Sequence, residues 1–255
     1  MKGINERQMR ILTELKENDF VRVQNLCDKF DVSSVTIRKD LSFLEKKGLL
    51  FRTHGGASKQ SLYAFERNIG EKESLQVDQK KKIAESSLPF IKEKDYIILG
   101  SGTTILYLAR MLNSFEKLTV VTASLFVSIE LCKNDNIKTL QLGGDVRKSS
   151  NSVIGSIAEY TLNDYSCNKV FLGVDGIDMD FGITTTNALE AQLNKAMIKA
   201  SEKVIVLADS SKIGKRSFGK IAEIQDMDIL VTDSGLKRKD QKALENMGVE
   251  IVIAL

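Results

Sequence analysis

The chain has 255 residues, of which 42% are hydrophobic and 28% are charged. That length suits one small and one medium-sized domain, and the composition excludes an intrinsically disordered protein. The longest apolar runs, such as Val204–Ala208, are too short to span a bilayer, and no signal peptide opens the sequence. We therefore expect a cytoplasmic protein with no membrane segment.

The cysteine and histidine content excludes several kinds of site. Cys27, Cys132 and Cys167 are odd in number and form no metal-binding pattern, so we expect reduced, buried thiols. The single histidine, His54, excludes a multi-histidine metal site and would have to serve any Ser-His-Asp triad. We expect neither a metal nor another cofactor.

The net charge of +3 is unevenly distributed along the chain. Residues 1–60 contain 12 lysines and arginines against 8 aspartates and glutamates, whereas the remaining 195 residues contain 25 against 26. The positive excess of the N-terminal quarter is a modest indication of nucleic-acid binding.

Apolar residues recur at helical spacing in three segments near the N-terminus. We expect helices over Asn5–Asn18, with Met9, Leu12 and Leu15 on its apolar face, over Val23–Phe30 and over residues 34–47. Gly48 would end the third helix, and a strand over residues 49–53 and a turn at residues 54–56 follow. Three helices followed by a strand and a glycine turn are typical of a winged helix-turn-helix domain.

The third helix has the features of a helix that reads DNA. Ser33 can cap it by accepting the backbone N–H of Thr36, and Ile37, Leu41 and Leu44 form one buried stripe. The opposite face carries a hydroxyl, a small apolar side chain and two cations, which suit phosphate oxygens, base edges and thymine methyls. We expect DNA contacts from Ser33, Ser34, Val35, Thr36, Arg38 and Lys39, and from Arg52 on the wing. An ordinary solvated helix face is the alternative.

Residues 32–57 read V-S-S-V-T-I-R-K-D-L-x-x-L-E-x-x-G-L-L-x-R-x-H-G-G-A, which closely resembles the N-terminal signature of the DeoR family of bacterial transcriptional regulators. The resemblance implies a DNA-binding domain over residues 1–57 and makes His54 part of a turn signature. Residues 58–79 lose clean periodicity and are expected to be an ordered linker. The basic run Lys80–Lys82 could be a DNA patch, but we expect the solvated start of a helix that runs to Pro89.

Residues 80–255 form the second expected domain, in which short apolar runs alternate with helical patterns. The expected strands are Tyr96–Leu99, Leu118–Val121, Thr139–Leu142, Val170–Val174, Val204–Ala208, Ile229–Val231 and Val249–Ile253, and the expected helices are Thr104–Leu112, Leu125–Cys132, Asn187–Ala200 and Gln241–Met247. This alternation predicts a mostly parallel α/β sheet covered by helices. Ligands of such sheets bind where strands end and helices begin.

Five loops that follow strands carry groups that bind anions or hydroxyls. Ser101, Gly102, Thr103 and Thr104 open a helix and suit a phosphate, although ordinary capping is the alternative. Arg147 could hold an anion or pair with Asp145 at the surface. Asp175 and Asp178 could bind sugar hydroxyls or act as acid and base, and a capped tight turn is the alternative. Further candidates are Thr184, Thr185, Glu190 and Lys212. Together these loops predict one polar site for a phosphorylated, hydroxyl-rich molecule.

The blocks S-G-T-T, L-G-G-x-x-R, F-L-G-V-D-G-I, G-I-T-T and L-A-D-S-S-K-x-G resemble the effector domain of the DeoR family. That domain is similar in fold to ribose-5-phosphate isomerase, and its members typically bind a phosphorylated sugar. One departure is Gly100, where family members commonly have an aspartate, so a hydroxyl contact from that position is in doubt.

The resemblance implies a transcriptional regulator, not an enzyme: a repressor of carbohydrate-metabolism genes whose grip on an operator is controlled by a phosphorylated sugar. The alternative is an enzyme resembling a sugar-phosphate isomerase fused to a DNA-binding domain, and a third interpretation is a DNA-binding protein with a vestigial second domain. One small reading helix rarely suffices for specific binding, so we expect a homo-oligomer, a dimer or tetramer, on double-stranded DNA. The sequence leaves open which sugar binds and whether it releases or strengthens the complex.

Overall fold

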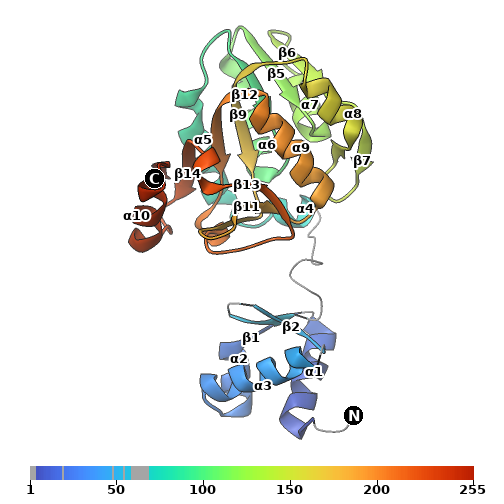
Figure 1. The fold of residues 1–255 in the computed structure, drawn as a ribbon, viewed down its shortest axis with the longest axis vertical. Coiled ribbons are helices and arrows are strands. Elements are labelled where there is room, and N and C mark those ends of the chain that lie inside the picture. Colours follow the sequence, from blue (N-terminus) through green and yellow to red (C-terminus); the bar gives the residue numbers. More distant parts are fainter. Residues whose placement is uncertain (1–3, 19, 48, 54, 59–68) are drawn as a thin grey trace. The chain divides into compact units, whose positions relative to one another are not determined.

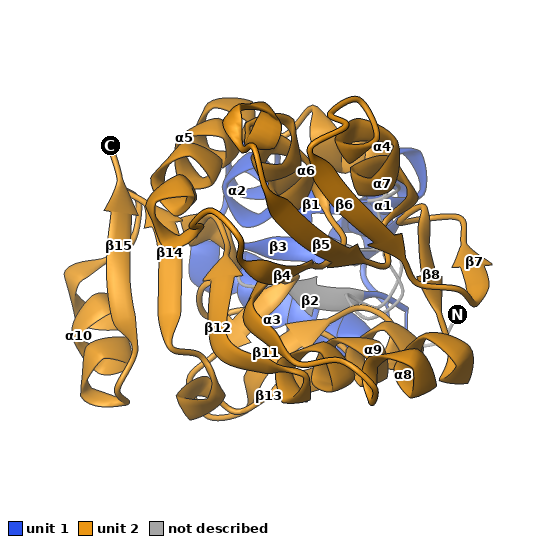
Figure 2. Ribbon diagram, turned by 90° about the horizontal axis from the view of Figure 1, so that it is seen from above, with its two compact units in different colours: residues 1–66 blue, residues 67–255 orange. Residues whose placement is uncertain are grey.

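The computed structural model describes residues 4–18, 20–47, 49–53, 55–58 and 69–255 (Figure 1). The chain divides into two compact units, residues 1–66 and residues 67–255 (Figure 2). This division falls inside the segment expected to be the linker, residues 58–79.

Unit 1 contains three helices and a small sheet. Its elements are α1 (Glu6–Asn18), β1 (Phe20–Arg22), α2 (Val23–Phe30), α3 (Ser34–Lys46), β2 (Phe51–Thr53) and β3 (Gly56–Ser58). The strands pair antiparallel in the order β1-β3-β2. This is the predicted winged helix-turn-helix architecture, with one addition: β1 was expected to be a plain connection between two helices.

The core of unit 1 comes from the inward faces of the three helices. The stripe predicted for α3 is confirmed, because Ile37, Leu41 and Leu44 are at most 1% exposed. The apolar face predicted for α1 was partly wrong. Met9 is 41% exposed, whereas Gln8 is buried together with Ile11 and Leu15. A polar residue therefore occupies a position that hydrophobicity alone assigned to solvent.

Unit 2 is an α/β domain built on a seven-stranded sheet. The strands of the sheet are β4 (Tyr96–Leu99), β5 (Leu118–Thr122), β6 (Ile137–Gln141), β9 (Cys167–Gly173), β12 (Ser201–Leu207), β14 (Ile229–Asp233) and β15 (Glu250–Ala254). The helices are α4 (Ile69–Glu73), α5 (Val77–Ser87), α6 (Thr103–Arg110), α7 (Leu125–Leu131), α8 (Ser156–Leu162), α9 (Ala188–Lys199) and α10 (Arg238–Asn246). All strand pairs in the sheet are parallel, as predicted.

The strand order is β15-β14-β12-β9-β4-β5-β6, and it reverses next to β4. From β4 the chain moves outward to β5 and β6, and then returns to place β9 on the other side of β4. The loops that leave β4 and β9 therefore diverge in opposite directions at the carboxyl edge of the sheet. In open α/β folds this switch point is where a ligand is expected.

Helices cover both faces of the sheet. Figure 2 shows α5, α6 and α7 on one face and α8 and α9 on the other. Each face of the sheet has its own hydrophobic core, and alternate side chains of a strand point into one core or the other. Ile98 packs on the side of α8 and α9, whereas Ile97 and Leu99 pack on the side of α5 to α7. None of the described helices is both long enough and apolar enough to cross a membrane.

Two small sheets, which were not predicted, are formed by segments that follow the carboxyl ends of strands in the large sheet. One is a hairpin of β7 (Asp145–Arg147) and β8 (Ser152–Ile154), and the other joins β10 (Gly176–Asp178), β11 (Gly182–Thr185) and β13 (Gly219–Ala222). These strands have three or four residues each, which is too short for a clear alternation of polar and apolar side chains.

Two further expectations about burial were wrong. Lys80 was expected to be solvated but is only 6% exposed, whereas the neighbouring Lys81 and Lys82 are exposed. The cysteines were all expected to be buried, but Cys132 is exposed and only Cys167 is fully buried. Cys132 directly follows the last turn of α7, where an apolar neighbourhood in sequence does not ensure cover from the fold.

Candidate functional site

The N-terminal half of α3 presents the side chains predicted to read DNA. Ser33 caps the helix through its hydroxyl, which accepts the backbone N–H of Thr36 at 3.3 Å, as predicted. Val35 is 58% exposed, and Arg38 and Lys39 are exposed as well. Ser34 and Thr36 are half-buried. The first two turns of the helix thus offer backbone N–H groups, hydroxyls and two cations outside the buried stripe.

A buried carboxylate fixes α3 against α1. Asp40 is 5% exposed and accepts hydrogen bonds from Arg7 Nε at 2.6 Å and Gln8 Nε2 at 2.8 Å. Because Asp40 lies on the inner side of α3, this contact sets the rotation of the helix and keeps Arg38 and Lys39 outward. The burial of Gln8 is explained by this same contact.

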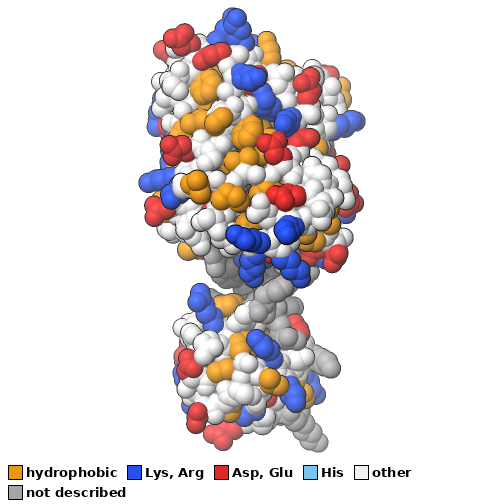
Figure 3. Space-filling view, turned by 90° about the vertical axis from the view of Figure 1, so that its left-hand side faces the viewer, with side chains coloured by type: hydrophobic (Ala, Val, Ile, Leu, Met, Phe, Trp, Pro, Cys, Tyr) orange, Lys and Arg blue, Asp and Glu red, His pale blue; other side chains and the backbone are white. Residues whose placement is uncertain are grey.

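The remaining predicted parts of the reader lie outside the described residues. Gly48 and His54 are among them, and the backbone of Arg52 lies in β2 while its side chain is not described. On the face of unit 1 that Figure 3 shows, lysine and arginine side chains lie among exposed hydrophobic ones.

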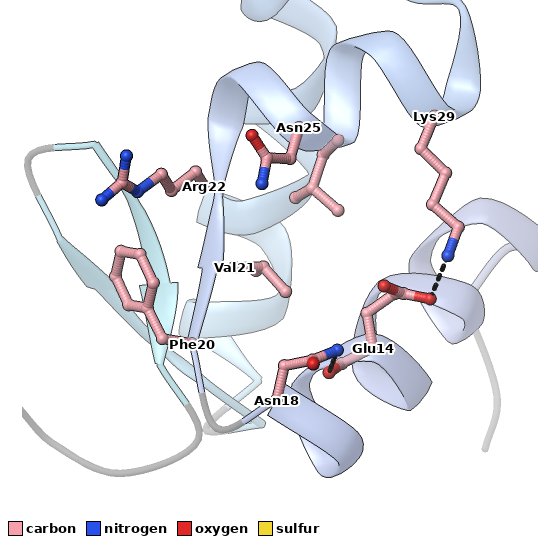
Figure 4. A pocket seen from close by; sticks show the side chains of 8 residues that line it. Glu14, Asn18, Phe20, Val21, Arg22, Asn25 and Lys29 are labelled. Atoms are coloured by element: carbon pink, nitrogen blue, oxygen red, sulfur yellow. Dashed lines mark hydrogen bonds and ion pairs between the residues drawn. The ribbon is translucent and has the colours of Figure 1, made fainter.

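Unit 1 also contains a cavity of about 280 Å³ between α1, β1 and α2 (Figure 4). Phe20, Arg22 and Asn25 line it, and Lys29 closes one side through an ion pair with Glu14. None of the residues predicted to bind DNA or effector lines this cavity, so it is separate from the reading surface.

In unit 2 three of the predicted effector residues, Ser101, Arg147 and Thr185, meet at Glu190 in the first turn of α9. Asn187 caps α9 by accepting the backbone N–H of Glu190 at 3.0 Å. The carboxylate then accepts Ser101 Oγ on Oε1 at 2.9 Å, and Thr185 Oγ1 on Oε2 at 2.6 Å. Glu190 thus joins the loop after β4 to strand β11.

Arg147 completes the shell around Glu190. Its Nη1 lies 2.9 Å from Glu190 Oε2, and the two side chains are only 9% and 10% exposed, so this is a buried ion pair and not a surface pair. Arg147 also donates to Ser150 Oγ at 3.1 Å and to Thr186 Oγ1 at 3.3 Å. The guanidinium therefore holds the β7–β8 hairpin against α9.

Asp175 extends the same network from the end of β9. Its Oδ2 accepts Thr185 Oγ1 at 3.2 Å and the backbone N–H of Thr186 at 3.3 Å, and its Oδ1 pairs with Lys72 Nζ at 2.8 Å. Burial alone would raise the pKa of Asp175, but the charges of Lys72 and Lys212, with these hydrogen bonds, lower it to about 2. Asp175 is therefore ionised at neutral pH.

Three lysines surround the two carboxylates of this edge, Asp175 and Asp209. Burial is the main cause that lowers the pKa of Lys80 to about 8, the charge of Asp209 opposes it, and the charges of Lys212 and Lys72 add to it. Lys80 Nζ donates to the backbone carbonyl of Lys72. The charge of Glu73 also opposes the lowering, but Glu73 is paired with Arg110, so the cations of this cluster still outnumber its carboxylates, which favours an anionic guest.

Of the other predicted effector residues, some lie close to the cluster, whereas others only stabilise the fold of unit 2. Thr103 and Thr104 begin α6 and are at most 8% exposed, and Gly102 caps that helix with a φ of +115°, where a side chain would be strained. Asp178 lies elsewhere: it pairs with Arg216 at 2.8 Å and accepts two backbone N–H groups of the following turn, which is the capped-turn alternative. The hydrogen bond from Arg216 is the main cause that lowers the pKa of Asp178.

Thr184 also serves the scaffold. Its hydroxyl donates to the carbonyl of Gly176 at 3.1 Å and accepts the backbone N–H of Ser217 at 2.9 Å. Because neighbouring strand residues face opposite sides, Thr185 reaches the cluster and Thr184 does not. Thr186, Lys72 and Lys80 were missed by sequence reasoning. The third hydroxyl of T-T-T could have signalled Thr186, but the sequence contains no comparable signal for the two lysines.

Gly100, the departure noted in the sequence, lies against the strand beside it. A Cβ at this position would approach Leu172 Cδ2 to 3.0 Å and the carbonyl oxygen of Phe171 to 3.3 Å. An aspartate here would require Leu172 to shift, so the glycine allows β4 and β9 to pack as they do.

Comparison with known proteins gives the same division of the chain. Residues 7–61 match the DeoR-like helix-turn-helix domain, and residues 75–234 match the DeoR C-terminal sensor domain. The HTH-type transcriptional regulator YulB of Bacillus subtilis (strain 168) is 40% identical over 248 residues, which cover 97% of this chain and 96% of that protein. A putative aga operon transcriptional repressor of Escherichia coli O157:H7 is 34% identical over 253 residues, covering 98% and 94% of the two chains.

Among solved structures, a D-ribose-5-phosphate isomerase in complex with phospho-erythronic acid aligns with a TM-score of 0.41 at 19% identity, covering 54% of each chain. A likeness this weak supports no conclusion about activity.

Proposed function

The chain belongs to the DeoR family of transcriptional regulators, and we propose that it is a repressor of carbohydrate-metabolism genes whose operator binding is controlled by a phosphorylated sugar. The chain is thus a DNA-binding regulator and not an isomerase. The repressor role, the sugar phosphate and the residues that bind each partner are the proposed parts.

One observation carries the effector half of the proposal: Glu190 gathers Ser101, Arg147 and Thr185 at the strand switch point. Both oxygens of Glu190 are engaged by these donors, so the carboxylate orders the site and is not a free base for proton transfer. The start of α6 at Gly102–Thr104 supplies helix N–H groups for a phosphate. Asp175 and Thr186 supply partners for sugar hydroxyls.

The DNA half rests on the exposed face of α3. We assign base-edge or phosphate contacts to Arg38 and Lys39, an apolar contact to Val35, and phosphate contacts to Ser33, Ser34 and Thr36. Arg52 on the wing is proposed to contact the minor groove or the phosphates beside the major groove that α3 enters. Since one such helix covers only a few base pairs, we propose that a homo-oligomer, a dimer or tetramer, presents paired readers to a repeated operator.

The proposal is tested by two measurements on the full chain. A thermal-shift screen compares phosphosugars with their unphosphorylated parents, and fluorescence anisotropy follows binding to duplexes from regions upstream of its own and neighbouring genes. We expect one phosphosugar, and not its parent sugar, to raise the melting temperature and to change DNA affinity. A chain that binds DNA with no response to any phosphosugar, or that sustains isomerisation of ribose 5-phosphate, would contradict the proposal.

A further inference from the structure

Helix α4 is the first described element that follows residues 59–68 along the chain. It contains only residues 69–73, which is too short to be stable by itself. Its position must therefore be held by contacts with the rest of unit 2. Any change in those contacts would reach the segment that leads to the reader.

Helix α4 contacts three elements of unit 2 that also contribute residues to the candidate site or its charged cluster. Ile69 is 7% exposed, and its backbone N–H donates to the carbonyl of Ser149, in the β7–β8 hairpin that carries Arg147, at 2.8 Å. Glu73 accepts Arg110 of α6 at 3.1 Å. Lys80 of α5 donates to the carbonyl of Lys72. Helix α4 is therefore held by the β7–β8 hairpin, α5 and α6.

The ion pair between Lys72 and Asp175 is the most direct of these links. Lys72 Nζ lies 2.8 Å from Asp175 Oδ1, and the side chains are 31% and 16% exposed. The other oxygen of Asp175 accepts the hydroxyl of Thr186, this hydroxyl accepts Arg147 Nη2, and Arg147 Nη1 pairs with Glu190. A continuous path of charged and hydrogen-bonded groups thus runs from α4 to the loop at Ser101.

We propose that the Lys72–Asp175 pair is a latch that holds α4 on the effector site, and that an anionic effector opens it by taking Lys72 as its own partner. This inference rests on the proposed function, because it names the residue through which that effector acts. The arrangement of charges supports it, because Lys72 and Lys212 both repel the ammonium of Lys80. The pKa of Lys80 is lowered to about 8, mainly by burial and further by the charges of Lys212 and Lys72. A phosphate dianion relieves that repulsion, and it competes with Asp175 for the ammonium of Lys72, the one lysine of α4.

Lys72 is therefore a coupling residue. Its charge contributes to the affinity for the effector. Its backbone belongs to α4, the first described helix of unit 2. A ligand can shift α4 only by binding the open arrangement more tightly than the closed one, and competition for Lys72 supplies that difference.

The test uses hydrogen exchange of the full chain, followed by mass spectrometry in the peptide that covers residues 69–76. The variants are Lys72→Gln, Lys72→Arg and the matched control Lys81→Gln, which removes an exposed lysine from the neighbouring helix α5. Without ligand, we expect Lys72→Gln to raise exchange in this peptide by about fivefold or more, while Lys72→Arg and Lys81→Gln stay near wild type.

The second arm adds the phosphosugar that stabilises the wild type most. We expect it to raise exchange in the same peptide of the wild type, Lys72→Arg and Lys81→Gln, but to add nothing in Lys72→Gln. A screen in which no phosphosugar stabilises the chain overturns the proposed function and the competition for Lys72 with it. A phosphosugar that stabilises the wild type while leaving this peptide unchanged, or unchanged ligand-free exchange in Lys72→Gln, overturns the latch alone.

Discussion

Replacing Arg147 by methionine isolates the effect of burial on an ion pair. The Arg147–Glu190 and Lys133–Glu130 pairs both have an N–O distance of 2.9 Å. The cation of the first is 9% exposed and that of the second is 62% exposed. Distance is thus matched, and solvent access differs.

The expected magnitudes follow from that difference. Removing one partner of a buried pair leaves an uncompensated charge and costs about 3–5 kcal/mol, whereas a surface pair contributes about 0–1 kcal/mol. For a domain the size of residues 67–255, each 1 kcal/mol lowers the melting temperature by about 2–4 °C. Arg147→Met should therefore lower the melting temperature of unit 2 by roughly 10 °C, and Lys133→Met by no more than about 4 °C.

Differential scanning calorimetry of the full chain measures both variants, since the transition of unit 1 serves as an internal reference. The double variant Arg147→Met with Glu190→Gln should recover part of the loss, because the unpaired charge is then gone. If Arg147→Met costs no more than Lys133→Met, the buried pair does not organise the site as described.

Three further predictions concern the two binding activities. Arg38→Ala should weaken DNA binding by about 5- to 150-fold if Arg38 contacts a base. If Arg38 contacts a phosphate, the slope of log affinity against log salt concentration should instead become shallower by about one. Lys16→Ala, on α1, should change neither quantity in anisotropy titrations. Thr103→Val should weaken phosphosugar binding, measured by calorimetry, with normal DNA affinity; lost DNA binding with normal ligand affinity would refute that role. Because the pKa of Lys80 is about 8, this cation is lost as pH rises through 8, so phosphosugar affinity should fall between pH 7 and 9. Lys80→Arg stays protonated and should remove that decline, and a wild type with constant affinity over this range would exclude Lys80 from the site.

The cap and the buried face of α3 could be predicted from sequence because their determinants are local. The Ser33 cap and the stripe of Ile37, Leu41 and Leu44 depend on residues within a few turns of each other. The error at α1 has a tertiary cause. Gln8 is buried because Asp40, on another helix, accepts its amide, and no spacing rule within α1 contains that partner.

The grouping of residues around Glu190 was predicted in part for a similar reason. Parallel strands bring their carboxyl ends to one edge, so Ser101, Asp175 and Glu190 could be grouped before the fold was known. Lys72 belongs to the polar segment that was expected to be the linker, and Lys80 to a basic run that was expected to be the solvent-exposed start of a helix. Only the tertiary fold places them beside Asp175 and Asp209. Short strands such as β7 and β10 lacked a periodic signal, and the roles of Arg147 and Asp178 depended on them.

The insertion of β9 between β4 and β12 also determines when during folding the effector site can exist. Ser101 and Glu190 are 89 residues apart in sequence, and Lys72 and Asp175 are 103 apart. Contacts of such long range close large loops and form late in folding, after local helices and neighbouring strand pairs. A chain synthesised only as far as β6 therefore contains all of unit 1 and still lacks Asp175, Thr185 and Glu190. Unit 1 can thus fold before the hydrogen-bonded cluster around Glu190 is able to form.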